Sequence, residues 1–153
     1  GNSSQLGYSL GLAMGAKLGD PDKLVINIMG DAAIGMAGMD IETAVRLKIP
    51  ILTIVLNNHV LSGYSKNYPV ATERFGFTNL YGNYSNLAKA LGAHAERVEV
   101  PQEIIPAINR ALEAMDTGYP ALIEVRYKPT SADFLLLNLY ILFLSELIIL
   151  KYS

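Results

Sequence analysis

The stretch KLVINIMGDAAIGMAG, Lys23 to Gly38, decides the fold class of this chain. It begins with an almost unbroken run of apolar and β-prone residues, which is typical of a strand buried on both faces of a parallel sheet. The run stops at Gly30, where a single carboxylate, Asp31, precedes a loop of small residues. We therefore predict a buried strand over 23–29 whose carboxyl end carries one isolated acid.

Segments of strand and helix character alternate along most of the chain. We expect, in order, a helix over 3–18, the strand over 23–29, a helix over 39–47, and a strand over 51–58, then a helix over 84–92, a strand over 93–100, a helix over 102–115 and a strand over 120–127. Such alternation predicts an α/β fold, a three-layer α/β/α sandwich with a mainly parallel sheet and right-handed crossovers. The Tyr- and Gly-rich residues 59–83 are expected to be a long irregular segment of functional importance.

Composition narrows the class of protein further. The chain has 153 residues, a net charge of −2 and no cysteine. Its length suits one domain, expected over 1–130, and its scattered Lys and Arg argue against a nucleic-acid surface. The missing cysteines exclude disulfides, thiolate metal sites and a cysteine nucleophile. A start without a basic, apolar leader makes a cytoplasmic location the default expectation.

The last 23 residues, 131–153, differ from everything before them. Within them, Phe134 to Leu150 holds 14 apolar residues in 17. Three interpretations stay open: an anomalous terminus caused by a frame change, a helix covered by the fold or a partner, and a membrane contact. As a membrane span the segment is marginally short.

Three glycines are spaced by four in the first expected helix, at Gly7, Gly11 and Gly15. A glycine costs about 1 kcal/mol relative to alanine at a helical position, so the stripe needs a reason. It indicates either close packing against another backbone or the close approach of a ligand to the helix N-terminus, where free N–H groups favour anions. Lys17 and Asp20 follow too soon for a transmembrane dimer motif.

Two strand ends carry polar residues that could act together. Asp31 follows the first strand and Asn58 closes the second, with 26 residues between them. Ligands of open α/β sheets bind outside the carboxyl ends of the strands. A carboxylate and an amide oxygen form an oxygen-only set that suits Mg²⁺. The small residues Ala32, Ala33 and Gly35 would let backbone N–H groups approach a diphosphate closely.

Other glycine-loop motifs do not fit the spacing. Gly30, Gly35 and Gly38 do not form G-x-G-x-x-G, because position 32 is alanine. Gly35 is followed by Met36 rather than by lysine, so the loop is no P-loop. A dinucleotide fingerprint and a Walker motif are therefore both excluded.

The segment Gly30-Asp31-Ala32, 24 further residues and then Asn57-Asn58 resembles the G-D-G…N-N signature of thiamine-diphosphate-dependent enzymes. Alanine in place of the second glycine is a departure that members of this family tolerate. The similarity extends from about Gly1 to Lys128. It is closest to the C-terminal cofactor domain of the acetolactate synthase and 2-oxoacid decarboxylase group.

The resemblance implies a set of ligand-binding residues. Asp31 and the Asn58 side chain would bind Mg²⁺, and the backbone carbonyl of Val60 would be the third protein ligand. Ala32 and Ala33 would offer backbone donors to the diphosphate of the cofactor. The remaining cofactor-binding positions are Gly30 of the motif, Leu6 as the bulky residue that props the cofactor into its bent shape, Gln5 and Gly7 beside it, and Met36 near the thiazolium ring.

The resemblance also implies what the chain needs from elsewhere. The cofactor of this family attacks a 2-oxo acid and holds the electrons left by lost CO₂. The glutamate that activates its aminopyrimidine lies on a separate pyrimidine-binding domain, which this chain does not contain. We therefore expect a partner domain or subunit and a homodimer or larger oligomer, and we assign no catalytic residue here. The absence of Trp and the position of Gly63, five residues after Asn58, favour a generic 2-oxoacid lyase or transferase over acetolactate synthase proper.

Simpler interpretations compete with each of these assignments. Asp31 alone could be a helix N-cap or an Asx-turn residue, and the matching Asn58 is what favours a metal. His59 could face substrate or be an ordinary loop histidine, whereas His94 is expected to be structural. The loop tyrosines could line a pocket or pack on the core: Tyr64, Tyr68, Tyr81 and Tyr84.

Two other functions remain open on the sequence alone. The chain could be a non-catalytic remnant or assembly module that keeps the same α/β core. It could also be another Mg²⁺-dependent phosphate-binding domain, which would bind nucleotides rather than thiamine diphosphate.

Overall fold

The computed structural model describes residues 5–61 and 64–128. The expected tail over 131–153 therefore lies outside the described residues. No helix in the described part is both long and apolar enough to cross a membrane. The elements, in chain order, are α1 (Tyr8–Gly19), β1 (Ile26–Gly30), α2 (Asp31–Ala37), α3 (Asp40–Arg46), β2 (Leu52–Asn57), α4 (Tyr64–Asn67), α5 (Pro69–Phe75), α6 (Tyr84–Ala90), β3 (His94–Val98), the 3₁₀ turn η1 (Pro101–Glu103), α7 (Ile104–Met115) and β4 (Ala121–Arg126).

The four strands form one parallel sheet in the order β1-β2-β4-β3. Gly30 at the end of β1 lies beside Leu56 of β2, and Asn57 at the end of β2 lies beside Arg126 of β4. The carboxyl ends of three neighbouring strands are thus level with one another. This sheet confirms the predicted α/β class, and it places the polar strand ends on one edge.

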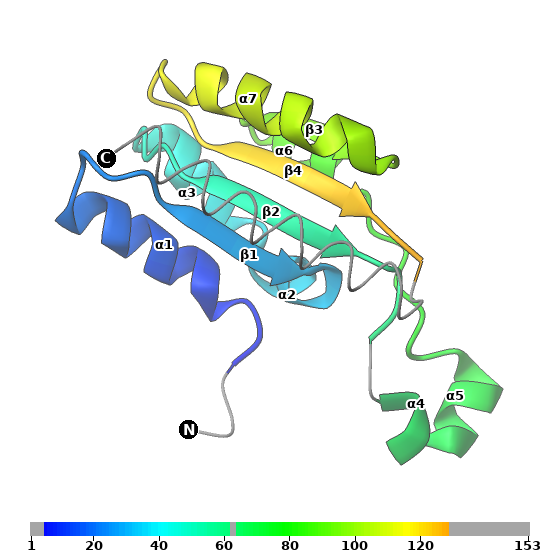
Figure 1. Ribbon diagram of the computed structural model, residues 1–153. Helices are drawn as coiled ribbons and strands as arrows, with labels where there is room; N and C mark the ends of the chain where they lie inside the picture. Colours follow the sequence, from blue (N-terminus) through cyan, green and yellow to red (C-terminus); the bar gives the residue numbers. More distant parts are fainter. Residues whose placement is uncertain (1–4, 62–63, 129–153) are drawn as a thin grey trace.

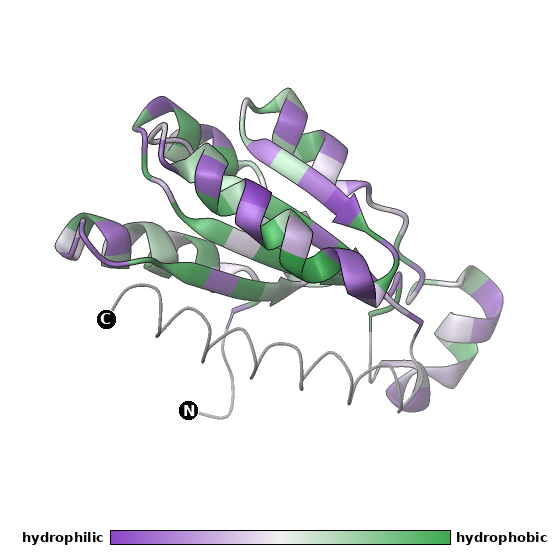
Figure 2. Ribbon diagram, turned by 45° about the horizontal axis from the view of Figure 1, so that its top comes forward, coloured by the Kyte–Doolittle hydropathy of each residue, from purple (hydrophilic) through white to green (hydrophobic). Residues whose placement is uncertain are grey.

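Helices cover both faces of the sheet (Figure 1). One buried cluster joins α1, α2, α3 and α6 to one face, through residues such as Leu10, Ile34, Ala44 and Ala88. A second cluster joins α7 to the other face. Figure 2 shows that the central strands are largely apolar and that α7 carries hydrophilic residues on its outer face. The predicted three-layer α/β/α arrangement is confirmed.

The prediction that β1 is buried on both faces is wrong. Asn27 and Met29 are buried, but Ile28 between them is 41% exposed. In the described part of the chain β1 pairs with β2 alone, and α7 packs mainly on β3 and β4. One face of β1 is therefore left open. The more central strands β2 and β4 are buried along nearly their whole length, as expected.

Two segments that we expected to be irregular contain helices. The small-residue loop after β1 forms α2, and the irregular segment 59–83 contains α4 and α5. The signals for α5 were present, because Pro69 stands at its first position and Gly76, with φ +56°, ends it. Figure 1 shows α4 and α5 set apart from the sheet, beyond the carboxyl ends of β1 and β2.

The glycine stripe of α1 meets another backbone at one position. Gly7 is the N-cap of α1, with φ +91°, and a Cβ added there would lie 2.9 Å from Ala37 Cβ and 3.0 Å from the carbonyl of Ala33. A Cβ added to Gly11 or Gly15 would have no described atom within 4 Å. Close packing thus explains Gly7, and it brings the segment before α1 against α2.

The difference in packing between Gly7 and Gly11 predicts opposite effects of alanine substitution on stability. Gly7→Ala should lower the free energy of unfolding by about 1–3 kcal/mol, because it combines a positive φ with a clash. Gly11→Ala should raise it by up to about 1 kcal/mol, because alanine is the better helix former and the added methyl meets open space. Urea unfolding of both variants measures the two changes. Equal effects at the two positions would contradict this packing.

Candidate functional site

The candidate site lies at the carboxyl ends of β1 and β2. Asp31 follows β1 directly as the first residue of α2, and its neighbour Gly30 is the N-cap. The Asp31 side chain is only 4% exposed, although it is an acid. Asn58 follows the last residue of β2. The structure therefore brings to one edge the two residues that the sequence paired, and it gives the N-cap position to Gly30 rather than to Asp31.

The Asp31 carboxylate connects the two strand ends. Its Oδ2 accepts a hydrogen bond from the backbone N–H of His59 at 2.8 Å, and its Oδ1 accepts one from the N–H of Ala32 at 2.9 Å. Within the described ranges no ion pair involves Asp31. A buried carboxylate without a cationic partner carries a large desolvation cost. The position is therefore one where a bound cation would be strongly favoured.

The turn after β2 carries two further oxygen atoms, the side-chain oxygen of Asn58 and the backbone carbonyl oxygen of Val60. Asn58 Oδ1 accepts a hydrogen bond from the N–H of Val60 at 3.0 Å, an Asx-type turn. Asn58 Nδ2 donates to the hydroxyl of Tyr127 at 3.1 Å. Because Tyr127 holds the nitrogen, the amide oxygen is directed toward the turn that carries the Val60 carbonyl.

His59, between these two residues, has an unusual backbone and side chain. Its φ is +61°, a left-handed conformation that non-glycine residues adopt at a cost. Its N–H donates to Asn57 Oδ1 at 3.0 Å as well as to Asp31. Its ring Nδ1 is buried and has no hydrogen-bond partner within the described residues. The backbone of His59 thus links the residues that follow β1 to those that follow β2.

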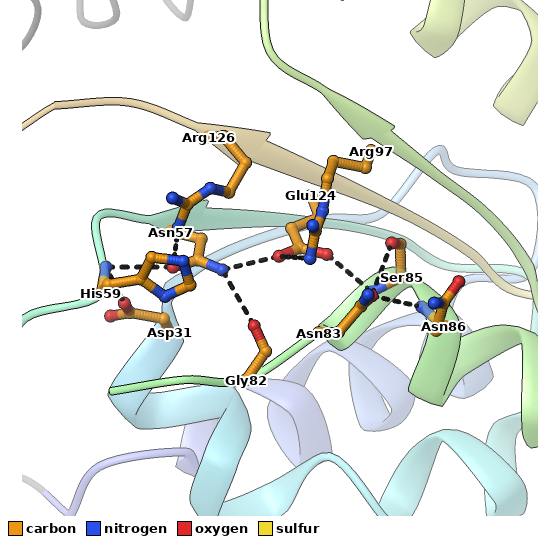
Figure 3. A network of polar contacts seen from close by, with 10 residues as sticks. All are labelled: Asp31, Asn57, His59, Gly82, Asn83, Ser85, Asn86, Arg97, Glu124 and Arg126. Carbon is orange, nitrogen blue, oxygen red and sulfur yellow. Dashed lines mark hydrogen bonds and ion pairs between the residues drawn. The ribbon is translucent and has the colours of Figure 1, made fainter. Parts of the chain in front are cut away.

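A buried acid in β4 supports the same turn, and Figure 3 shows its contacts. Glu124 is 0% exposed. Its Oε1 accepts hydrogen bonds from Asn57 Nδ2 at 2.6 Å and from Arg97 Nη2 at 3.0 Å, and its Oε2 accepts one from the N–H of Ser85 at 2.8 Å. Arg126 Nη1 donates to Asn57 Oδ1 at 3.1 Å. This network was not predicted from the sequence, although a lone acid inside the apolar strand PALIEVRY was a signal for it.

The charges in this region shift the pKa values of their neighbours. Burial by itself would raise the pKa of Glu124, but the hydrogen bonds from Ser85, Asn57 and Arg97 outweigh burial and hold that pKa below its usual value. Burial raises the pKa of the Tyr84 and Tyr127 phenols, and the negative charge of Asp31 raises both further. The two phenols therefore stay protonated, and both lie within the electrostatic reach of Asp31.

The lowered pKa of Glu124 predicts how stability depends on pH. A carboxyl group whose pKa is lower in the folded state stabilises the fold above its unfolded pKa, here about 4.5, and this contribution is lost as the pH falls through the folded pKa. We expect the free energy of unfolding to fall below pH 4.5, and to fall less steeply in Glu124→Gln. Urea unfolding between pH 6 and pH 3 measures both profiles. Parallel profiles would rule out this role for Glu124.

The residues expected to hold the organic part of the cofactor lie around the start of α1 and on α2. Gln5 and Leu6 are exposed, Leu6 to 41%, while Gly7 is buried against α2. Met36 is 65% exposed on α2. The contact at Gly7 brings these two groups of residues together beside α2.

The residues expected to meet the phosphate groups lie at the start of α2. The first-turn N–H groups of a helix have no acceptor within the helix, so those of Ala32 and Ala33 are suited to an anion. The N–H of Ala32 is bonded to Asp31 Oδ1 in this structure. A Cβ on Gly30 would have no described atom within 4 Å, so there is open space beside the end of β1.

Several of the simpler interpretations fit their residues well. Tyr84 is buried in the core cluster, and His94 contacts Glu96 at 3.1 Å on β3. Tyr64 stacks on Tyr68, with ring centroids 6.3 Å apart, in the segment that carries α4 and α5. These contacts need no ligand to explain them.

The donor set fits a hard cation that takes oxygen ligands. Within the described residues no group of three or more His, Cys, Asp or Glu side chains could hold a metal ion. The expected set of Asp31, Asn58 and the Val60 carbonyl contains only one such side chain, so it belongs to a different type of site. One carboxylate, one amide oxygen and one backbone carbonyl suit Mg²⁺ or Ca²⁺ and do not suit Zn²⁺.

A parallel α/β sheet with an isolated acid and an Asx turn at adjacent strand ends belongs to the class of domains that bind ligands beyond the carboxyl ends of their strands. Residues 1–125 match the family described as "Thiamine pyrophosphate enzyme, C-terminal TPP binding domain". The chain belongs to this family, as the resemblance implied, and the family favours thiamine diphosphate over a nucleotide as its ligand.

Individual relatives agree with this assignment. The chain is 35% identical over 137 residues to the acetolactate synthase large subunit IlvG of Mycobacterium tuberculosis, an alignment that covers 83% of this chain and 23% of that protein. It is 30% identical over 140 residues to a 2-hydroxyacyl-CoA lyase of Oryza sativa, covering 84% of this chain and 23% of the relative. Among solved structures, it matches a thiamine diphosphate-dependent 4-hydroxybenzoylformate decarboxylase of Rhodococcus jostii RHA1 with a TM-score of 0.69 and 29% identity, over 80% of this chain and 23% of that one.

The chain spans about a quarter of the length of these relatives. What the chain shares with these relatives is therefore their cofactor-binding domain. The reaction named for each relative belongs to a much longer protein. The family thus identifies what this domain binds more directly than which reaction it serves.

Proposed function

We propose that this chain binds the diphosphate of thiamine diphosphate together with Mg²⁺, as the cofactor domain of a lyase or transferase that acts on 2-oxo acids. One observation carries the proposal. The buried Asp31 after β1 accepts the N–H of His59, and this bond places the acid against the turn that carries Asn58 and Val60.

Three residues would hold the metal in this proposal. Asp31 and Asn58 would contribute side-chain oxygens, and Val60 its backbone carbonyl. Asn58 Oδ1 would exchange its bond with the Val60 N–H for the metal, while Tyr127 keeps the amide oriented. The other Mg²⁺ positions would be left for phosphate oxygens and water, as Mg²⁺ prefers.

The organic part of the cofactor would lie between the start of α1 and α2. Leu6 would support its bent shape, with Gln5 and Gly7 beside it and Met36 toward the thiazolium ring. The exposure of Leu6 and Met36 is consistent with surfaces that a ligand covers. When bound, thiamine diphosphate supplies the carbanion and the electron sink for chemistry at a 2-oxo carbon.

The proposal also requires a partner. The chain spans about a quarter of the length of its relatives. The glutamate that acts on the aminopyrimidine would come from a pyrimidine-binding domain or subunit. We propose a homodimer or larger oligomer for the complete enzyme, with a small 2-oxo acid as substrate. The chain alone is expected to bind the cofactor weakly and not to turn over.

Calorimetric titration of the full chain tests the proposed function. Thiamine diphosphate should bind in the presence of Mg²⁺, and excess EDTA should weaken that binding. Thiamine, which lacks the diphosphate, and ADP, which lacks the thiamine, serve as matched ligands. Binding of ADP as tightly as thiamine diphosphate, or binding that does not change with Mg²⁺, would contradict the proposal.

A non-catalytic assembly module is the second candidate function. Such a module would keep the same α/β core and bind the cofactor without turnover. Addition of a separately expressed pyrimidine-binding domain from a relative distinguishes the two. Turnover of a 2-oxo acid by the mixture would exclude the module, and cofactor binding without turnover would support it.

A further inference from the structure

The buried Glu124 lies in the hydrogen-bond network behind the proposed metal ligands, because it is bonded to Asn57, the residue next to Asn58 in the chain. It is the only acid of β4, and its carboxylate joins β2, through Asn57, the N-terminus of α6, through Ser85, and β3, through Arg97. Figure 3 shows the carboxylate between these elements. A carboxylate is costly to bury even when it accepts from a side-chain amide, a backbone N–H and a guanidinium, so its presence needs a reason.

Asn57 transmits the position of Glu124 to the turn after β2. Its Nδ2 donates to Glu124 at 2.6 Å, and its Oδ1 accepts from the His59 N–H at 3.0 Å and from Arg126 at 3.1 Å. An amide that is flipped by 180° would place its NH₂ against two donors and its oxygen against a carboxylate. The carboxylate of Glu124, together with the Gly82 carbonyl to which Asn57 Nδ2 also donates at 3.4 Å, therefore favours the amide orientation that directs Oδ1 to His59.

The correct orientation of Asn57 supports the strained residue of the turn. His59 has φ +61°, and its N–H is shared between Asn57 Oδ1 and Asp31 Oδ2. A conformation of this kind persists only where its surroundings hold it. The residues on either side, Asn58 and Val60, are those that the proposed function assigns to Mg²⁺.

We propose that Glu124 is a positioning residue for the Mg²⁺ site, acting through Asn57 and the backbone of His59 on the turn that carries Asn58 and Val60. This inference rests on the proposed function for the identity of the ligand. Its structural part, the control of the turn by Glu124, holds without any ligand.

Two substitutions, tested singly and together, distinguish a positioning role of Glu124 from a general contribution to stability. Glu124→Gln alone removes the charge and leaves an NH₂ group facing donors. Asn57→Asp alone places two carboxylates side by side. The double variant restores the bond between the two side chains with donor and acceptor exchanged, because the introduced amide donates to the introduced carboxylate, whose second oxygen still accepts from His59 and Arg126. Arg97 lacks its acceptor in Glu124→Gln and in the double variant alike, so these two variants differ only in the bond to position 57. Glu96→Gln is the matched control, since Glu96 is paired with Arg110 at 2.7 Å on the α7 side of the sheet.

Two measurements on the full chain report the effects of these substitutions. The first is amide hydrogen exchange of His59 and Val60 without ligand, compared with the amides of α7. We expect Glu124→Gln to accelerate exchange at His59 and Val60 by about tenfold or more while α7 changes little. The second is the Kd for Mg²⁺ at a fixed thiamine diphosphate concentration, which should rise by about 10- to 100-fold. The double variant should recover most of both losses, and Glu96→Gln should show neither.

Several results would overturn the inference. These are unchanged exchange at His59 and Val60 in Glu124→Gln, acceleration that is equal throughout the chain, an unchanged Kd for Mg²⁺, or a double variant no better than the single ones. If the parent chain binds no Mg²⁺ with thiamine diphosphate, the proposed function fails, whereas the exchange measurement still decides whether Glu124 controls the turn.

Discussion

Asp31→Ala is expected to abolish the Mg²⁺-dependent binding of thiamine diphosphate, with an affinity loss of about 100-fold or more. Asp31 is the one carboxylate at the joined ends of β1 and β2, and it is buried without a cationic partner in the described part of the chain. Removing it deletes the only charged metal ligand of the proposed set. Because Mg²⁺ is bound chiefly through carboxylates and phosphates, the remaining amide and carbonyl oxygens would hold it poorly. Calorimetric titration with and without Mg²⁺ measures the loss.

Two further variants make this result specific. Asp31→Asn keeps an oxygen that can accept the His59 N–H, so it should fold like the parent and still lose the metal. Asp40→Ala removes an exposed acid from the first turn of α3 and should leave the affinity unchanged. Retention of Mg²⁺-dependent binding in both Asp31 variants would refute the metal assignment.

Glu124→Ala should have the largest effect on stability, a loss of about 3–5 kcal/mol, because it removes one partner from a buried ionic network. The Ser85 N–H and Arg97 would lose the acceptor they have in Glu124, and Asn57 Nδ2 would keep only its longer bond, 3.4 Å, to the Gly82 carbonyl. A loss of this size is a large part of the 5–15 kcal/mol that typically stabilises a domain. Urea unfolding at pH 7 measures it, and a fall in melting temperature should accompany it.

Glu96→Ala provides the comparison for this prediction. Glu96 is also paired with an arginine, but the arginine side chain, that of Arg110, is 48% exposed. Partly exposed pairs contribute little, so a loss of about 1 kcal/mol or less is expected. Similar losses for the two substitutions would show that burial of Glu124 is not what makes its network strong.

The layered fold could be predicted from local patterns. The continuous apolar runs of β2 and β4 predicted buried parallel strands, and both are central in the sheet. The run of β1 looked the same, but β1 lies at the edge of the described sheet and Ile28 is exposed. Strand order decides burial, and strand order depends on long-range pairing that a local pattern does not contain.

Short helices were the other feature that local reasoning missed. α2 contains Gly35, and α4 has only four residues, so periodicity is too weak to reveal them. α5 was foreseeable from Pro69 and Gly76 at its two ends. Boundaries agreed more closely for a longer helix such as α7, expected over 102–115 and observed over Ile104–Met115.

At the candidate site, the sequence predicted the positions of the residues but not the bonds between them. The spacing of Asp31 and Asn58 placed both at adjacent strand ends, where the structure has them. The bond from the His59 N–H to Asp31 is made by a backbone group, so the residue type at position 59 could not predict it. Glu124 was missed because its partners Asn57, Ser85 and Arg97 come from three separate elements and the turns beside them.

The central claim, that this edge of the sheet binds Mg²⁺ with a diphosphate, is tested most directly by a crystal structure of the full chain with thiamine diphosphate and Mn²⁺. Mn²⁺ accepts the same oxygen ligands as Mg²⁺ and can be located by its anomalous scattering. We expect one anomalous peak in direct coordination with Asp31, Asn58 Oδ1 and the Val60 carbonyl, beside the diphosphate. A metal bound elsewhere, or a diphosphate bound away from the start of α2, would contradict it.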